Sequence, residues 1–107
     1  MSLTLYRIIK AREPTLLDFM SLAAQGLASA TTDDEIARLQ SGISCWATEA
    51  QARRTAKRFP ALGSFVATVD IPDDAPLRIE RTRGPGHHTV WGAPTALISW
   101  VTAVGPV

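Results

Sequence analysis

The sequence predicts an α+β fold: a curved, mostly antiparallel sheet with about three helices from the N-terminal half packed on it. Segments with helical spacing of apolar residues lie in the first half of the chain, and alternating segments dominate the second half. Hydrophobic residues make up 46% of the chain and charged residues 20%, as in globular proteins. Because 107 residues suffice for one core but not for two, residues 1–107 are expected to form a single domain.

The N-terminal third predicts one strand and two helices. Leu3–Lys10 alternates in polarity and is rich in residues that favour strands. Thr15 can cap a helix over residues 16–27, where apolar residues recur at three- and four-residue spacing. Further along, Thr32 and Glu35 have the spacing of a capping box, which predicts the start of a second, short helix.

The middle of the chain predicts a brief strand followed by a third helix. Ile43–Ala47 is short and apolar, as expected of a strand. Thr48 and Gln51 form another capping box, which opens a helix that runs to about Arg58. Pro60 then disfavours continuation of the helix, because the residue before a proline avoids helical geometry.

The second half predicts mainly strands. Phe65–Val69 and Leu77–Thr82 alternate, and His88–Trp91 is a candidate short strand after the turn or loop at Gly84-Pro85-Gly86. Ala96–Val104 also alternates and is dominated by β-branched and aromatic residues. We therefore expect it to be the longest strand of the sheet rather than a helix.

Cysteine content, charge and terminal segments indicate the cellular compartment and the kinds of partner to expect. Cys45 is the only cysteine and cannot form an intramolecular disulfide, whereas small secreted domains usually carry several. The N-terminus lacks the basic and apolar regions of a signal peptide, and the apolar C-terminal stretch is too short to cross a bilayer. A cytoplasmic protein without membrane contacts is expected. The formal net charge of +1 leaves nucleic-acid binding open but does not favour it.

Four residues in the first half are candidates for ligand binding. Arg7 lies in the predicted first strand, where a guanidinium could bind phosphate; it could equally be a solvated or paired strand-end residue. Ser44 and Trp46 share one side of the next predicted strand and precede the helix start at Thr48. A hydroxyl, an aromatic face and free helix amides together suit a nucleotide. The alternative is that Thr48 is only a cap and Trp46 only a core residue.

The histidine pair is the most unusual feature of the second half. His87 and His88 follow the Gly-Pro-Gly sequence and could provide proton transfer or hydrogen bonding, or could belong to a polar loop. Adjacent strand residues point to opposite faces, and no further histidine is present, so no metal site is expected. Cys45 lies opposite Ser44 and Trp46 on its strand and is expected to be a buried small residue rather than a reactive thiol.

A basic helix face suggests a different kind of function. The cations of the third predicted helix fall at i, i+1, i+4 and i+5 and therefore gather on one side. They are Arg53, Arg54, Lys57 and Arg58. Such a face could bind an acidic partner protein or a nucleic acid, or could simply be solvated.

In its order of elements, the chain resembles compact members of the ADP-ribosyltransferase-like fold. Leu5-Tyr6-Arg7 is similar to the opening strand of that fold, whose Arg or His holds the nucleotide. Gly42–Thr48 resembles its second motif, a short strand rich in small hydroxyl residues before a helix. The resemblance implies a cleft for NAD or another nucleotide, with Arg7 on phosphate and Ser44 and Trp46 lining the pocket.

The chain departs from this family in its third motif. It has no Glu-x-Glu or Gln-x-Glu sequence, and Glu80 is the only acidic residue on a late predicted strand. The resemblance therefore implies that Glu80 replaces the catalytic glutamate, or that His87 or His88 acts with Arg7 as in the RNA-phosphate-processing branch. On these terms the chain is an ADP-ribosyltransferase-like or NAD-cleaving protein. The alternative is a non-catalytic interaction module of antitoxin, immunity or accessory type, so whether it is an enzyme stays open.

Overall fold

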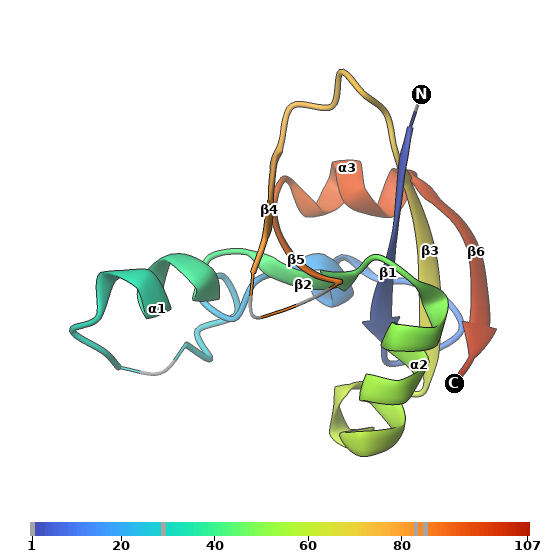
Figure 1. The fold of residues 1–107 in the computed structure, drawn as a ribbon, viewed down its shortest axis with the longest axis horizontal. Helices are drawn as coiled ribbons and strands as arrows, with labels where there is room; N and C mark the ends of the chain where they lie inside the picture. Colours follow the sequence, from blue (N-terminus) through green and yellow to red (C-terminus); the bar gives the residue numbers. More distant parts are fainter. Residues whose placement is uncertain (1, 29, 83, 85) are drawn as a thin grey trace.

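A computed structural model describes residues 2–28, 30–82, 84 and 86–107. Within these residues, six strands form one antiparallel sheet in the order β4-β5-β2-β1-β3-β6 (Figure 1). The strands are β1 (Leu3–Ile9), β2 (Ile43–Trp46), β3 (Phe65–Ile71), β4 (Arg78–Arg81), β5 (His87–Trp91) and β6 (Val101–Pro106). The helices are α1 (Asp34–Gln40), α2 (Glu49–Arg58) and α3 (Pro94–Ser99), with the short 3₁₀ turns η1 (Leu16–Phe19) and η2 (Pro60–Leu62). The α+β prediction is confirmed.

The central strand β1 buries a different cluster on each face of the sheet. Leu5 and Ile9 point into the larger cluster, where Phe19 of η1 and Leu97 of α3 cover the sheet. Ile8 points the opposite way, as the period of two in a strand requires. On that face, α2 packs its inner alanines, which are fully buried, against the sheet. Both faces of the sheet centre are therefore covered, by η1 and α3 on one side and by α2 on the other.

Side-chain caps start the two longer helices. Thr48 is the N-cap of α2, as predicted, and its side chain accepts a hydrogen bond from Gln51 N at 3.2 Å. The predicted cap of α1 was wrong by one residue. Asp33 rather than Thr32 is the N-cap, and its carboxylate accepts from the amides of Glu35 and Ile36 at 2.9 and 3.1 Å. A carboxylate can accept two amides at once in this position, which a hydroxyl does less well.

The predicted helix that begins at Leu16 is wrong beyond its first turn. Thr15 is the N-cap, but only η1 forms, and the chain continues as turns. Phe19 is buried, whereas Leu22 and Leu27 are 48% and 65% exposed. The apolar side chains after Phe19 therefore have no surface to pack against. A short helix is not stable without such packing, so the helix does not continue.

The predicted strand over residues 96–104 is also wrong in its first half. Residues 94–99 form α3, with Pro94 in its first turn, and β6 begins only at Val101. Consequently one of the three helices comes from the C-terminal half and not, as expected, from the N-terminal half. Pro94 is preorganised for a helix start, and Leu97 is buried in the larger cluster, so packing outweighs the alternating pattern that predicted a strand from Ala96.

The predicted turn or loop at Gly84-Pro85-Gly86 falls between β4 and β5. Arg83 and Pro85 lie outside the described residues, so this prediction cannot be compared with the structure over its whole length. Strand β5 starts at His87, one residue earlier than predicted. Thr82 N donates to the His87 carbonyl at 3.0 Å and closes the hairpin.

Gly63 provides a test of how tightly the chain passes against β1. A Cβ atom at Gly63 would lie 2.2 Å from the carbonyl oxygen of Ile9, which already accepts a hydrogen bond from Ser64 N. We expect Gly63→Ala to lower the free energy of unfolding by about 1–3 kcal/mol in urea denaturation. Gly105→Ala is the control, because its Cβ would meet Arg53 at 3.5 Å, an ordinary contact. Equal losses for the two variants would contradict the prediction.

Candidate functional site

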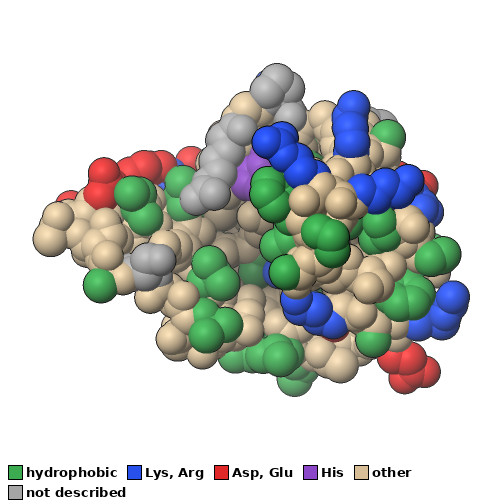
Figure 2. Space-filling view, turned by 90° about the horizontal axis from the view of Figure 1, so that it is seen from below, with side chains coloured by type: hydrophobic (Ala, Val, Ile, Leu, Met, Phe, Trp, Pro, Cys, Tyr) green, Lys and Arg blue, Asp and Glu red, His purple; other side chains and the backbone are tan. Residues whose placement is uncertain are grey.

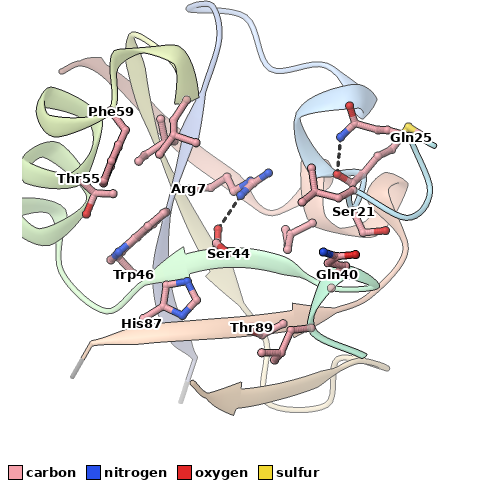
Figure 3. Close-up of a pocket in the computed structure, with 17 residues that line it drawn as sticks. Arg7, Ser21, Gln25, Gln40, Ser44, Trp46, Thr55, Phe59, His87 and Thr89 are labelled. Carbon is pink, nitrogen blue, oxygen red and sulfur yellow. Dashed lines mark hydrogen bonds between the residues drawn. The ribbon is translucent and has the colours of Figure 1, made fainter. Parts of the chain in front are cut away.

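A cavity of about 520 Å³ lies where β1, β2 and β5 meet the segments that follow η1 and α1 on one side and α2 on the other (Figure 3). Arg7, Ser44, Trp46 and His87 line it, and all four were predicted as candidate site residues. Residues from widely separated parts of the chain therefore converge on one cavity. Its size is within the range of pockets that bind small molecules.

Arg7 lies in a split between two strands. Strand β1 pairs with β3 along its whole length but with β2 at one register position, Tyr6 with Trp46. Beyond that pair, the Arg7 guanidinium connects the two strands in place of backbone pairing. Nη1 donates to the Ser44 carbonyl at 2.8 Å (Figure 3). Nε donates to the Asp18 carbonyl at 3.0 Å. Arg7 thus joins β1, β2 and η1 in one fixed arrangement.

The charge of Arg7 is held in a partly desolvated position. Burial lowers the pKa of Arg7, while the neighbouring Cys45 and Asp18 act in the opposite direction. Arginine nonetheless stays protonated in proteins at neutral pH. The hydrogen bonds that Arg7 makes with described residues use Nε and Nη1 and not Nη2. The guanidinium can therefore donate to a ligand while it keeps both carbonyls.

One wall of the cavity is aromatic. The rings of Trp46 and His87 lie 5.4 Å apart at 82°, an edge-to-face contact that fixes both side chains. Phe59 and Leu62, next to α2, continue this wall at the rim and are 51% and 44% exposed. Exposed apolar side chains beside a cavity can cover an aromatic ring of a ligand.

The opposite wall is polar and comes from the segments around η1 and α1. Ser21, Gln25 and Gln40 point toward the cavity, and Gln25 Nε2 donates to the Met20 carbonyl at 2.8 Å (Figure 3). The described lining residues include a guanidinium and an imidazole but no carboxylate. Because nothing there repels negative charge, the cavity suits an anionic ligand.

Three predicted site residues lie elsewhere. Thr48 is exposed at the start of α2 and serves as its cap. His88 is paired with Cys45 across the sheet, on the face opposite Ser44 and His87. Glu80 neighbours the cavity residue Thr89 in the sheet but forms ion pairs with two arginines. The structure therefore brings four of the seven predicted residues together.

The ion pairs of Glu80 join the edge of the sheet to α1. Its carboxylate lies 2.8 Å from Nη1 of Arg38 and 2.7 Å from Nε of Arg78. Arg38 also lies over the ring of Trp91 at 5.1 Å. A carboxylate paired in this way holds its charge away from the cavity. No group of three or more His, Cys, Asp or Glu residues that could hold a metal ion occurs in the described part of the chain.

Sequence reasoning missed the polar wall of the cavity. Gln25 belonged to a segment predicted as helix, and Gln40 gave no signal of its own. Thr89 could have been found, because it lies two residues after His87 on a strand and therefore shares its face. The position of Gln25 depends on the turns after η1, which the apolar pattern does not predict. Gln40 is the last residue of α1, and its place at the cavity depends on how that helix packs.

Cys45 lies behind this site and is predicted to be inert at neutral pH. It is 3% exposed, and burial raises the pKa of its thiol from 9.0 to about 11, with Arg7 opposing the shift. The unfolded chain therefore loses the thiol proton at lower pH than the folded chain, so stability falls as pH rises from 9.0 towards 11. We expect wild type to lose up to about 1.4 kcal/mol per pH unit more than Cys45→Ala in urea denaturation. Parallel pH profiles for the two proteins would contradict this.

Comparison with known proteins does not assign a family. No protein-family model matches the sequence, and no curated protein and no solved structure is significantly similar to it. Among the described residues, no helix is both long enough and apolar enough to cross a membrane. The function is therefore inferred from the geometry of this chain.

Proposed function

We propose that the cavity binds a nucleotide, with NAD as the first candidate. The observation that carries the proposal is the part-buried Arg7 guanidinium, which lies in a cavity with Trp46 and His87 on one wall. Arg7 would donate to a phosphate, and charge-assisted hydrogen bonds of this kind are the strong ones. Trp46 would contact a base or nicotinamide ring, and Ser44 would supply a hydroxyl beside it.

The geometry favours His87 as the residue that acts on a bound ligand. It shares the cavity with Arg7, whereas Glu80 is paired with arginines and His88 lies on the opposite face of the sheet. An imidazole can accept or donate a proton near neutral pH. If turnover occurs, we propose that Arg7 holds the phosphate and that His87 exchanges a proton with the ligand, while Glu80 contributes to folding.

The test is ligand-observed NMR of the purified protein with NAD, recorded over hours. We expect saturation transfer to adenine or nicotinamide protons, and any release of nicotinamide appears in the same spectra. His87→Ala should weaken binding, whereas His88→Ala should leave it unchanged, because the two neighbours lie on opposite faces of the sheet. No saturation transfer at millimolar NAD, or equal loss in both variants, would contradict the proposal.

A second candidate function is binding of an acidic protein partner through α2. Figure 2, which views the molecule from the α2 side, shows Lys and Arg side chains among hydrophobic ones over the right half of this face. Arg53 is tied to Glu49 at 2.7 Å and to the Pro106 carbonyl, and Arg58 lies over Phe59 at 5.3 Å. Arg54 and Lys57 are exposed on the same helix. Basic and apolar groups side by side suit an acidic polypeptide.

The two candidate functions predict that different variants lose binding. Reversing the charge of Arg54 and Lys57 to glutamate should weaken binding of poly-glutamate, used as the acidic probe, and should leave NAD binding unchanged. Binding of poly-glutamate should also weaken as salt is raised. If poly-glutamate does not bind wild type, or binds the double variant equally well, the second candidate is excluded.

A further inference from the structure

The ring of His87 is held by a group of hydrogen bonds at the base of the β4–β5 hairpin. Its Nδ1 atom lies 3.0 Å from Thr82 Oγ1 and 3.1 Å from the Thr82 carbonyl oxygen. Thr82 Oγ1 also lies 2.7 Å from Oγ1 of Thr89. Thr82, which follows β4, therefore holds one nitrogen of a cavity-lining histidine, and Thr89 of β5 in turn contacts the Thr82 hydroxyl.

These contacts determine which ring nitrogen carries the proton. A carbonyl oxygen has no proton and can only accept, so the 3.1 Å contact requires a proton on Nδ1. Thr82 Oγ1 can accept from the same N–H, and its own proton can then point to Thr89. Thr89 is 3% exposed, so its hydroxyl needs a protein partner, and Thr82 provides it. The contacts with Thr82 and Thr89 are satisfied together when Nδ1 carries a proton, and in the neutral ring this is the Nδ1–H tautomer.

The remaining nitrogen then carries a lone pair. In a neutral imidazole with a proton on Nδ1, Nε2 is an acceptor. Figure 3 shows the ring of His87 next to that of Trp46, in the cavity that Arg7 also lines. The guanidinium supplies donors and the imidazole supplies an acceptor. A ligand that matches both carries an anionic group for Arg7 and a hydrogen-bond donor for His87.

We propose that Thr82 is a positioning residue that fixes His87 as the Nδ1–H tautomer, so that Nε2 accepts a hydrogen bond from a hydroxyl of an anionic, sugar-phosphate-containing ligand. This inference rests on the proposed nucleotide site for its ligand class. The arrangement of Thr82, His87 and Thr89 itself belongs to the free protein. A nucleotide supplies both groups the site requires, a phosphate and a ribose hydroxyl.

The first experiment measures the tautomer in the free protein. Long-range ¹H–¹⁵N correlation spectra distinguish protonated from unprotonated ring nitrogens, and His87→Ala assigns the signals against those of His88. At a pH above the ordinary range of histidine titration, we expect Nδ1 of His87 to be the protonated nitrogen. This result needs neither a ligand nor a further variant. Protonation of Nε2 instead would overturn the proposal.

The second experiment removes the hydroxyl of Thr82. In Thr82→Val, the carbonyl alone holds the ring, and we expect the Nδ1–H population to fall and the affinity for AMP to drop about 3- to 10-fold. Thr82→Ser keeps the hydroxyl and should restore both. Thr102→Val, at an exposed position of β6, is the matched control and should change neither. A normal tautomer and normal affinity in Thr82→Val would overturn the positioning role.

The outcomes separate this inference from the proposed function. If the free protein shows the Nδ1–H tautomer but neither AMP nor NAD binds, the proposed nucleotide site is wrong. The sugar-phosphate ligand proposed for His87 is then wrong as well. If AMP binds while His87 is protonated on Nε2, the nucleotide site stands and the role of Thr82 is wrong. Tighter binding of AMP than of 2′,3′-dideoxy-AMP, which lacks only the ribose hydroxyls, supports the hydroxyl contact, and equal affinities count against it.

Discussion

Replacing Arg7 with glutamine is expected to lower the affinity of the cavity for NAD about 10- to 100-fold. Glutamine removes the positive charge and most of the donors, while its length lets it reach part of the same space. The described lining residues contain no other Lys or Arg that could take over the phosphate contact. The loss should therefore be larger than for any other residue of the cavity. Isothermal titration calorimetry measures it directly.

The same variant must be checked for folding, because Arg7 also holds the carbonyls of Ser44 and Asp18. Leaving these groups without a donor costs about 1–3 kcal/mol each where they are buried. Arg7→Lys keeps the charge and should recover part of the affinity. Arg12→Gln is the matched control, since Arg12 lies over the ring of Phe65 at 5.1 Å, outside the cavity. A folded Arg7→Gln protein with wild-type affinity would exclude the proposed phosphate site.

Replacing Phe19 with alanine is expected to lower the free energy of unfolding by about 3–5 kcal/mol. Phe19 is 1% exposed and has the largest fully buried side chain among the described residues. It anchors η1 in the larger cluster next to α3. Because η1 also supplies the Asp18 carbonyl that accepts from Arg7, the variant should weaken NAD binding even where it is still folded.

Chemical denaturation with fluorescence detection measures the loss. Leu17→Ala is the control on the same turn, because Leu17 is 60% exposed and its loss should change stability by no more than about 0.5 kcal/mol. A small effect of Phe19→Ala, or a large one of Leu17→Ala, would show that η1 packs differently from the arrangement described. Unchanged NAD affinity in folded Phe19→Ala would show that Arg7 does not depend on η1.

Local sequence signals were sufficient where a few neighbouring residues decide the structure. The strand around Arg7 and the helix that begins after Thr48 formed as predicted, because alternation and capping act within one or two turns. The α+β class follows from the same patterns. The sequence also identified Arg7, Ser44 and Trp46 as candidate ligand-binding residues, and these three lie on adjacent strands and line the same cavity.

Local signals failed where packing outweighs propensity. Residues 20–27 have helical spacing, but the structure gives them no apolar surface beyond Phe19. Residues 96–104 alternate as a strand does, but residues 94–99 form α3, because burial of Leu97 stabilises a helix that Pro94 can start. In both segments the deciding contacts come from distant parts of the chain, which a pattern in one segment does not contain.

The sequence by itself determined the fold class, the strand that carries Arg7, the cap of α2 and the residue types available for a site. Only the tertiary structure decided which of those residues meet. Strand register placed His87 in the cavity and His88 behind it. Arg38, which lies 42 positions before Glu80 in the sequence, forms an ion pair with the Glu80 carboxylate. The physical reason is that propensities act between near neighbours, whereas a cavity is built by strand pairing and packing of residues far apart in sequence.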